Sequence, residues 1–306
     1  MIVFKRAPLM RRLTPRTRRG LLLGLLFISP WLIRLVCLTA YPLLASLYYS
    51  FTSYDIIRAP RWVGLENYVG LMRDSVFRQT VYNTLYYMVF GVPAQVLTGF
   101  FLAVLLNRGI RFRSLFRTIF FMPSIIPQVS AAVLWLWLLQ PQFGPFNYLL
   151  IKLGLPSQPW LSSLTLVKPT LIMISLWGSG QVMVIFLAAL QDVPQHLYDA
   201  AKIDGANWWQ ELRHVTIPIV TPAILFTLLT GSIHAFEYFT YPYVMTRGGP
   251  AYASTFYPHY LYENAFHWFK MGYSSAMAWV MFVVVVVFAL LLFGSSARWV
   301  YYAHEG

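Results

Sequence analysis

Charged residues are scarce in this chain of 306 amino acids. Asp, Glu, Lys and Arg together make up 11% of it, whereas apolar residues make up 58%. A soluble domain has roughly a quarter charged residues, so the composition excludes an ordinary soluble protein and predicts an integral membrane protein. Cysteine is scarcer still: Cys37 is the only one, which excludes an internal disulfide.

The chain also lacks the motifs of common catalytic sites. None of its five lysines lies in the Gly-x-x-x-x-Gly-Lys-Ser/Thr context that holds nucleotide phosphates. No two of its six histidines are three or four residues apart, and the pairs His196–Asp199 and His234–Glu237 supply too few ligands for a metal. We therefore expect no catalytic residue, no metal and no cofactor, and we expect any ATP hydrolysis to occur on a partner chain.

Six segments are long and apolar enough to cross a bilayer, which takes about 20 mostly apolar residues. A segment in lipid must satisfy its backbone hydrogen bonds internally, so all six are predicted to be helices. Pro123 and Pro127 predict a kink in the third. The predicted fold is an all-α membrane protein with a basic tail, residues 1–19, and one transmembrane domain, residues 20–306, whose spans lie at about 21–49, 80–105, 115–139, 168–190, 218–245 and 272–297.

Lysine and arginine are distributed unequally between the two sides that six spans define. The side of the N-terminal tail carries fourteen, and the opposite side carries seven or eight. Cytoplasmic loops are enriched in basic residues, so both termini and the loop at about 191–217 are predicted to be cytoplasmic. The net charge of +13 is assigned to orientation and to contact with anionic membrane lipids, not to nucleic-acid binding. The apolar run after the tail is too long for a signal peptide.

Two segments on the opposite side are predicted to have structure of their own. Residues 51–71 are rich in aromatic side chains and predict an amphipathic lid at the outer interface. Residues 140–167 contain four prolines and predict a short helix between turns.

The cytoplasmic loop between the fourth and fifth spans is unusually polar. Residues 196–204 are predicted to form a helix that Gly205 ends, because a positive φ costs glycine little, and a second helix is expected at about 207–214. An amphipathic helix that lies on lipid usually carries Lys and Arg on its polar face. Acids predominate here, so the loop is predicted to contact another protein; they are Asp192, Asp199, Asp204 and Glu211.

This loop is similar to that of a known family. Asp199-Ala-Ala-x-x-Asp-Gly-Ala206, followed by Ile217-Pro218, resembles the EAA loop of permease subunits from bacterial ABC importers. The family usually has Glu at the position of Asp199. Aspartate keeps the negative charge of glutamate, but its side chain is shorter. Three other stretches resemble the sugar-importing branch, of the maltose and glycerol-phosphate type: Val63-Gly-Leu-Glu-Asn-Tyr68, Leu106-Asn-Arg-Gly-Ile with Arg113-Ser-Leu-Phe-Arg-Thr118, and Thr246-Arg-Gly-Gly-Pro250.

The resemblance implies a fold, partners and a role. The fold is the six-helix, MetI-like fold of type I importer permeases in the bacterial inner membrane. The partners are a second permease subunit in a heterodimer, a dimeric ATP-binding subunit at the cytoplasmic face, and an extracytoplasmic solute-binding protein. The role is non-catalytic: the subunit forms half of a pathway for a carbohydrate or related polyol and couples it to the ATPase. The matching coupling residues are Asp199, Ala200, Ala201, Asp204, Gly205, Ala206 and Pro218.

Polar residues inside spans are costly, which makes them functional candidates. In the family that the chain resembles, sugar-contacting positions lie on the two helices that flank the EAA loop. Hydroxyl, amide and aromatic groups suit a sugar, whose hydroxyls form hydrogen bonds and whose CH faces stack on rings. The pathway candidates in these two spans are Ser175, Gly178, Gln181, Glu237, Tyr238 and Tyr241.

Several alternatives remain open from the residues alone. Glu237 and His234 could pair with each other or with the partner permease and merely fill the interface. Arg34, in the first span, could snorkel to the membrane surface or pair with Glu237. An ion-gradient-driven secondary transporter is the alternative function, although such proteins usually show inverted repeats and buried acids at midplane. A membrane enzyme lacks a convergent catalytic set.

Overall fold

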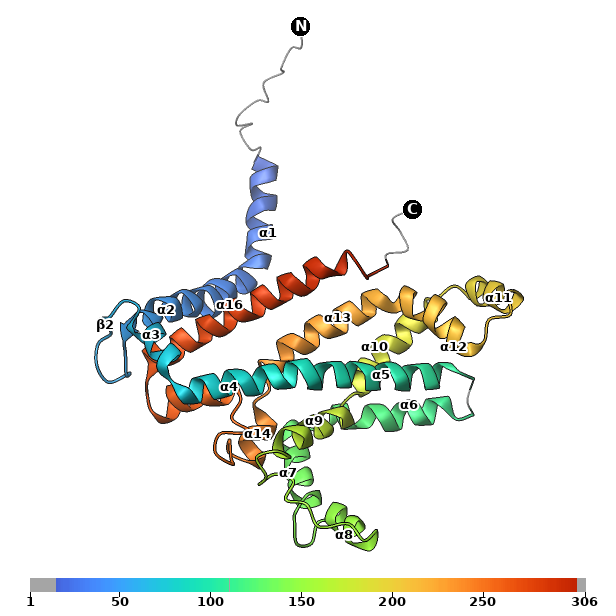
Figure 1. Cartoon of the computed structure of the whole chain (residues 1–306). Coiled ribbons are helices and arrows are strands. Elements are labelled where there is room, and N and C mark those ends of the chain that lie inside the picture. Colours follow the sequence, from blue (N-terminus) through green and yellow to red (C-terminus); the bar gives the residue numbers. More distant parts are fainter. Residues whose placement is uncertain (1–14, 110, 302–306) are drawn as a thin grey trace.

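Helices dominate the computed structural model, which describes residues 15–109 and 111–301 (Figure 1). Most of the predicted tail therefore lies outside the described residues. Among those described, four helical stretches are long and apolar enough to cross a membrane: Leu23–Ser50, Ser75–Asn107, Trp208–Met245 and Met271–Ser296. Two bent helix pairs bring the number to six if each pair is one span, in agreement with the six predicted.

The four long stretches divide into shorter elements. The first comprises the later part of α1 (Pro15–Arg34), η1 (Leu35–Ala40) and α2 (Tyr41–Ser50), and the second comprises α4 (Ser75–Tyr86), η2 (Tyr87–Gly91) and α5 (Val92–Asn107). The third runs through α12 (Trp208–Glu211), η4 (Leu212–Thr216), α13 (Ile217–Ala235) and α14 (Thr240–Met245), and the last is α16 (Met271–Ser296).

Two predicted spans are bent much more sharply than the sequence indicates. The third divides into α6 (Arg113–Phe121) with η3 (Met122–Ile125) and α7 (Gln128–Leu138), which meet at 99°. Pro127 is the cause, because the residue before a proline is driven out of the helical region, and Ile126 is extended with ψ 130°. The fourth was predicted as one helix but divides at Gly178 and Ser179 into α9 (Val167–Trp177) and α10 (Gly180–Gln191), bent by 51°.

Helix α10 packs closely against two neighbouring helices. A Cβ at Gly180 would collide with the backbone carbonyl of Phe120, so α6 crosses the first turn of α10 with no room for a side chain. A Cβ at Gly99 of α5 would lie 2.6 Å from Cγ1 of Val182. Small residues let membrane helices approach this closely. The position of α10 is thus set by two glycine contacts far apart in sequence.

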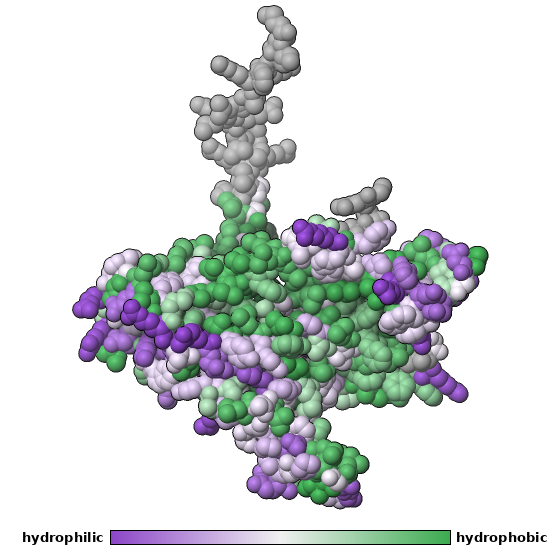
Figure 2. Space-filling model, viewed as in Figure 1, coloured by the Kyte–Doolittle hydropathy of each residue, from purple (hydrophilic) through white to green (hydrophobic). Residues whose placement is uncertain are grey.

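The two ends of the bundle are polar and the middle is apolar. Figure 2 shows apolar residues over α2, α16 and α13, with hydrophilic residues at the two ends and along the lower edge of this view. One end, here called the hairpin end, carries β1 (Thr52–Ser53), β2 (Arg61–Trp62) and α3 (Glu66–Arg73); the other, the loop end, carries α11 (Gln195–Ile203) and α12 (Figure 1). The protein is therefore a multi-pass membrane protein.

The segment expected to form a lid is the hairpin β1–β2 with α3, and α8 (Pro145–Lys152) is a short helix within residues 140–167.

Asp74 fastens the hairpin end. Its carboxylate caps α4 by accepting hydrogen bonds from the amides of Val76 (2.8 Å) and Phe77 (3.2 Å). It also accepts from the hydroxyls of Tyr260 (2.6 Å), in α15 (Tyr257–Tyr262), and Tyr273 (2.7 Å), in α16. Partial burial favours a higher pKa for Asp74, but these four hydrogen bonds outweigh it and hold the pKa below its ordinary value. One side chain thus joins three helices.

Candidate functional site

A cavity of about 590 Å³ lies between the broken helices. Its walls come from α5, from η3 and the start of α7, from the α9–α10 break, and from the end of α13 with the residues up to Tyr241. Many of the lining groups are neutral hydrogen-bonding side chains: Gln95, Ser124, Gln128, Ser175, Gln181, Thr227, Thr230 and Thr240. A cavity of this size with a few convergent polar groups is the usual form of a small-molecule site.

All six residues predicted for the substrate pathway line this one cavity. Ser175, Gly178 and Gln181 reach it from the α9–α10 break, where the helix axis turns by 51°. Glu237, Tyr238 and Tyr241 reach it from a second break, between the end of α13 at Ala235 and the start of α14 at Thr240. The cavity therefore forms where two neighbouring helices are interrupted.

Side chains from other helices bind the carbonyls at the first break, where the carbonyl of Ser175 also accepts from the amide of Gly178 (3.1 Å). The hydroxyl of Ser124 donates to the carbonyl of Gly178 (3.3 Å), and the side-chain amide of Gln95 donates to the carbonyl of Ser175 (3.4 Å). A helix end in an apolar surrounding requires such partners. The break is thus a built feature that α5 and η3 support.

Three tyrosine rings form a stack along one wall. The rings of Tyr87 and Tyr238 are 4.3 Å apart and inclined by 13°, and those of Tyr238 and Tyr241 are 5.9 Å apart and inclined by 19°. The hydroxyl of Tyr238 donates to the carbonyl of Leu171 (3.3 Å), which fixes the ring. Tyr87 belongs to η2 and was not among the pathway residues predicted from the sequence, and neither were Gln95 and Gln128. The rule that singled out Gln181, a polar side chain in an apolar span, applies equally to the two glutamines.

Glu237, the carboxylate that lines the cavity, is paired with His234. Nδ1 of His234 lies 3.1 Å from Oε2 of Glu237, and both side chains are more than half exposed toward the open space. Among the described residues, Arg34 has no ion pair with Glu237; it ends α1, an exposed helix that projects from the bundle (Figure 1). The pairing of His234 with Glu237 is thus the one alternative whose geometry is present.

The loop between α10 and α13 folds as a helix–turn–helix at the loop end. Helix α11 ends in a Schellman motif. Gly205 has φ +74°, its amide donates to the carbonyl of Lys202 (3.1 Å), and the amide of Ala206 donates to the carbonyl of Ala201 (2.9 Å). Asn207 and Gln210 then form a reciprocal capping box that starts α12. Local signals in the sequence therefore determine both helices.

Five of the seven predicted coupling residues line one groove. It has a volume of about 450 Å³ and contains Ala200, Ala201, Asp204, Gly205 and Ala206. Asp199 does not line it; its carboxylate accepts a hydrogen bond from Gln195 (3.3 Å) on the exposed side of α11. Pro218 also lies outside the groove, in the first turn of α13. Asp204 is therefore the acid that faces the groove.

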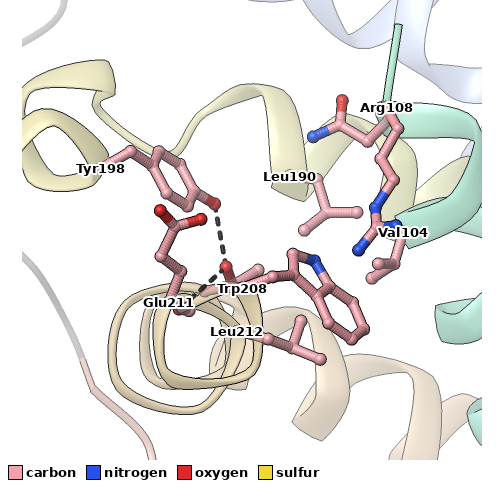
Figure 3. A pocket seen from close by; sticks show the side chains of 9 residues that line it. Val104, Arg108, Leu190, Tyr198, Trp208, Glu211 and Leu212 are labelled. Atoms are coloured by element: carbon pink, nitrogen blue, oxygen red, sulfur yellow. Dashed lines mark hydrogen bonds between the residues drawn. The ribbon is translucent and has the colours of Figure 1, made fainter. Parts of the chain in front are cut away.

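A second, smaller cavity of about 140 Å³ separates this loop from the end of α5 (Figure 3). The guanidinium of Arg108 lies 4.1 Å from the ring centre of Trp208, in a cation–π contact that closes one side. On the other side Tyr198 and Thr216 share a hydrogen bond of 3.0 Å, and Thr216 donates to the carbonyl of Glu211 (3.3 Å). These contacts fasten α11 and α12 to the helices behind them.

Helices α10 and α13 connect the cavity to the loop. Each begins or ends at a cavity break and has its other end at the α11–α12 loop, and the two pack against each other. Because helices are stiff, a displacement of α11 and α12 would reach the cavity walls through these two helices. The architecture thus joins a polar cavity between broken helices to an acidic surface loop.

Known proteins share this architecture. Residues 95–305 match the family model described as the inner membrane component of binding-protein-dependent transport systems. The probable ABC transporter permease YesP of Bacillus subtilis is 40% identical, over 93% of this chain and 94% of its own length. The chain belongs to this family. The lactose transport permease LacF of Rhizobium radiobacter is 32% identical over 88% of this chain and 92% of its own.

A solved structure agrees with the assignment. A chain of a bacterial ABC transporter involved in the import of the polysaccharide alginate superposes with a TM-score of 0.80, at 26% identity over 94% of this chain and 99% of that one. The protein is thus an ABC importer permease with the MetI-like fold, and ATP is hydrolysed on a separate chain. This decides between the two transport classes in favour of the ATP-driven importer.

Proposed function

We propose that this permease forms half of the pathway for a carbohydrate or related polyol in the bacterial inner membrane. The other half is a second permease subunit, with which it forms a heterodimer. An extracytoplasmic solute-binding protein delivers the substrate at the hairpin end. A dimeric ATPase docks on the loop end, which is cytoplasmic, as are both termini; the distribution of Lys and Arg between the two sides supports this orientation.

One observation carries the proposal. The six predicted pathway residues converge on one 590 Å³ cavity, and the two helices that flank this cavity lead directly to the predicted coupling loop. Hydroxyl, amide and stacked tyrosine groups suit a sugar, because its hydroxyls form hydrogen bonds and its CH faces pack on rings. The names of the relatives, which include a lactose permease and an alginate importer, support a carbohydrate as the substrate class.

The coupling role is assigned to α11 and α12. The groove is a concave surface with several small side chains and one carboxylate, and its lining includes Ala200, Ala201, Asp204, Gly205 and Ala206. Its shape supports the proposal that a side chain of the ATPase docks there. Asp199, on the exposed face of α11, and Pro218, at the start of α13, frame the contact. The capping box and the Schellman motif make the element rigid enough to transmit a displacement.

Reconstitution tests the proposal. The permease, its partner permease and the ATPase would be placed together in nanodiscs, and ATP hydrolysis would be measured with the sugar-loaded binding protein. We expect hydrolysis to be stimulated only when both permeases are present. Uptake by this chain alone, in cells that lack the second permease, would refute the half-pathway.

A further inference from the structure

Among the described residues that line the cavity, the only acid is Glu237 and the only base is His234. Glu237 is the single carboxylate among the lining residues, and of the lysines and arginines that the structure describes none lines it. His234 is the one group there that can become a cation, and it is paired with Glu237 at 3.1 Å.

This distribution of charged groups bears on whether the substrate is neutral or acidic, which family membership leaves open. Lactose, named for one relative, is neutral, whereas alginate, named for the structural relative, is acidic. A carboxylate or sulfonate that enters an apolar surrounding loses its hydration and requires a cation or several donors in exchange. The present cavity offers neutral amides, hydroxyls and a tyrosine stack, and it adds a carboxylate of its own that repels an anion.

We infer that the half of the pathway built by this permease accepts neutral sugars and disfavours acidic ones. The inference rests on the proposed function and adds the charge class of the substrate. Glu237 is the specificity-determining residue: it accepts hydrogen bonds from sugar hydroxyls and excludes uronate and sulfonate groups. The tyrosine stack formed by Tyr87, Tyr238 and Tyr241 contributes ring faces that do not depend on charge.

A charge-selective labelling experiment tests this directly, because the chain has a single cysteine. In a Cys37→Ser background, Thr230→Cys places one thiol on the cavity wall, one helical turn before His234 and seven residues before Glu237. Ser157→Cys, on the exposed loop after α8, is the matched reference outside the cavity. Each variant, assembled with its partner subunits in nanodiscs, would be labelled with a trimethylammonium and with a sulfonate methanethiosulfonate of similar size. The sulfonate reagent is the stand-in for an acidic sugar.

The expected result is a several-fold preference for the cationic reagent at Thr230→Cys, relative to Ser157→Cys. Adding Glu237→Gln should return the ratio to that of the reference. A preference for the sulfonate reagent, or a ratio that Glu237→Gln does not change, would overturn the charge selectivity and leave the pathway standing. If neither reagent reached Thr230→Cys while both labelled Ser157→Cys, the cavity would not be an aqueous pathway, and the proposed function itself would fail.

Discussion

The guanidinium of Arg108 lies over the ring of Trp208 at 4.1 Å, although the two residues are one hundred positions apart in the sequence. Arg108 follows the last turn of α5, and Trp208 opens α12. The contact therefore joins the second long membrane helix to the loop on which we propose that the ATPase docks. It gives the loop a connection to the bundle besides its own two flanking helices (Figure 3).

Arg108→Ala is expected to weaken coupling without unfolding the protein. An exposed cation–π contact contributes about 0.5–1 kcal/mol, so uptake at equal ATP hydrolysis should fall about two- to fivefold. Arg108→Lys keeps a cation over the ring and is the matched control, with most of the activity retained. Equal transport per ATP in Arg108→Ala and wild type would show that the loop is held by α10 and α13 alone.

Gly205→Leu is expected to abolish uptake while the protein still inserts in the membrane. The residue has φ +74°, where a side chain costs roughly 1–2 kcal/mol, and leucine would also fill the groove. Gly154→Leu is the matched control, because Gly154 has the same φ of +74° and likewise has no atom within 4 Å of an added Cβ. Membrane levels and sugar uptake would be compared for both. Normal uptake in Gly205→Leu would remove the coupling role of the groove.

Local signals explain which parts of the molecule could be predicted from the sequence. The helical spans follow from apolar runs of sufficient length, and the end of α11 follows from Gly205, whose positive φ a glycine permits. The six pathway candidates were found because polar groups in apolar spans are conspicuous and because the resemblance places sugar contacts on the two helices that flank the loop. Gln95 could have been found from the first of these signals. Their roles remain proposals, but their convergence on one cavity is observed.

The remaining features depend on residues that are distant in the sequence. At the 51° bend, the carbonyl of Phe120 leaves no room for a Cβ at Gly180, and the hydroxyl of Ser124 donates to the carbonyl of Gly178. The bonds from Tyr260 and Tyr273 to Asp74 span 186 and 199 positions. No periodicity or composition encodes such a contact, because it exists only after the helices have packed.

Asp74→Asn is expected to lower stability in a manner that depends on pH. Asparagine still caps α4, but it loses the charge that binds Tyr260 and Tyr273, so we expect a loss of about 1–2 kcal/mol at pH 6. The hydrogen bonds lower the pKa of Asp74 in the folded state below its ordinary value of 3.8. The stabilisation is therefore complete above pH 3.8 and is lost as the pH falls through the pKa of the folded state. Melting temperatures in detergent from pH 6 downward would measure the convergence of variant and wild type.

The control for this prediction is Asp55→Asn. Asp55 is an acid of the same end whose half-exposed side chain lies 4.0 Å from Arg58, and a solvent-accessible pair of this kind contributes little. Its melting temperature should follow that of the wild type at every pH. A gap between wild type and Asp74→Asn that persisted at low pH would contradict the assignment of the stabilisation to the ionised carboxylate.

Glu237→Gln is expected to change transport without changing stability. The side chain is more than half exposed, so its melting temperature should match that of the wild type, whereas its loss of charge and of an acceptor for sugar hydroxyls should alter substrate affinity or turnover several-fold. Glu66→Gln, an exposed glutamate in the first turn of α3, is the control with unchanged uptake. If uptake kinetics of Glu237→Gln equal those of the wild type, the pair of His234 and Glu237 merely fills space between helices. A shift in kinetics at constant stability places Glu237 on the pathway, because a side chain that only filled space would leave both unchanged.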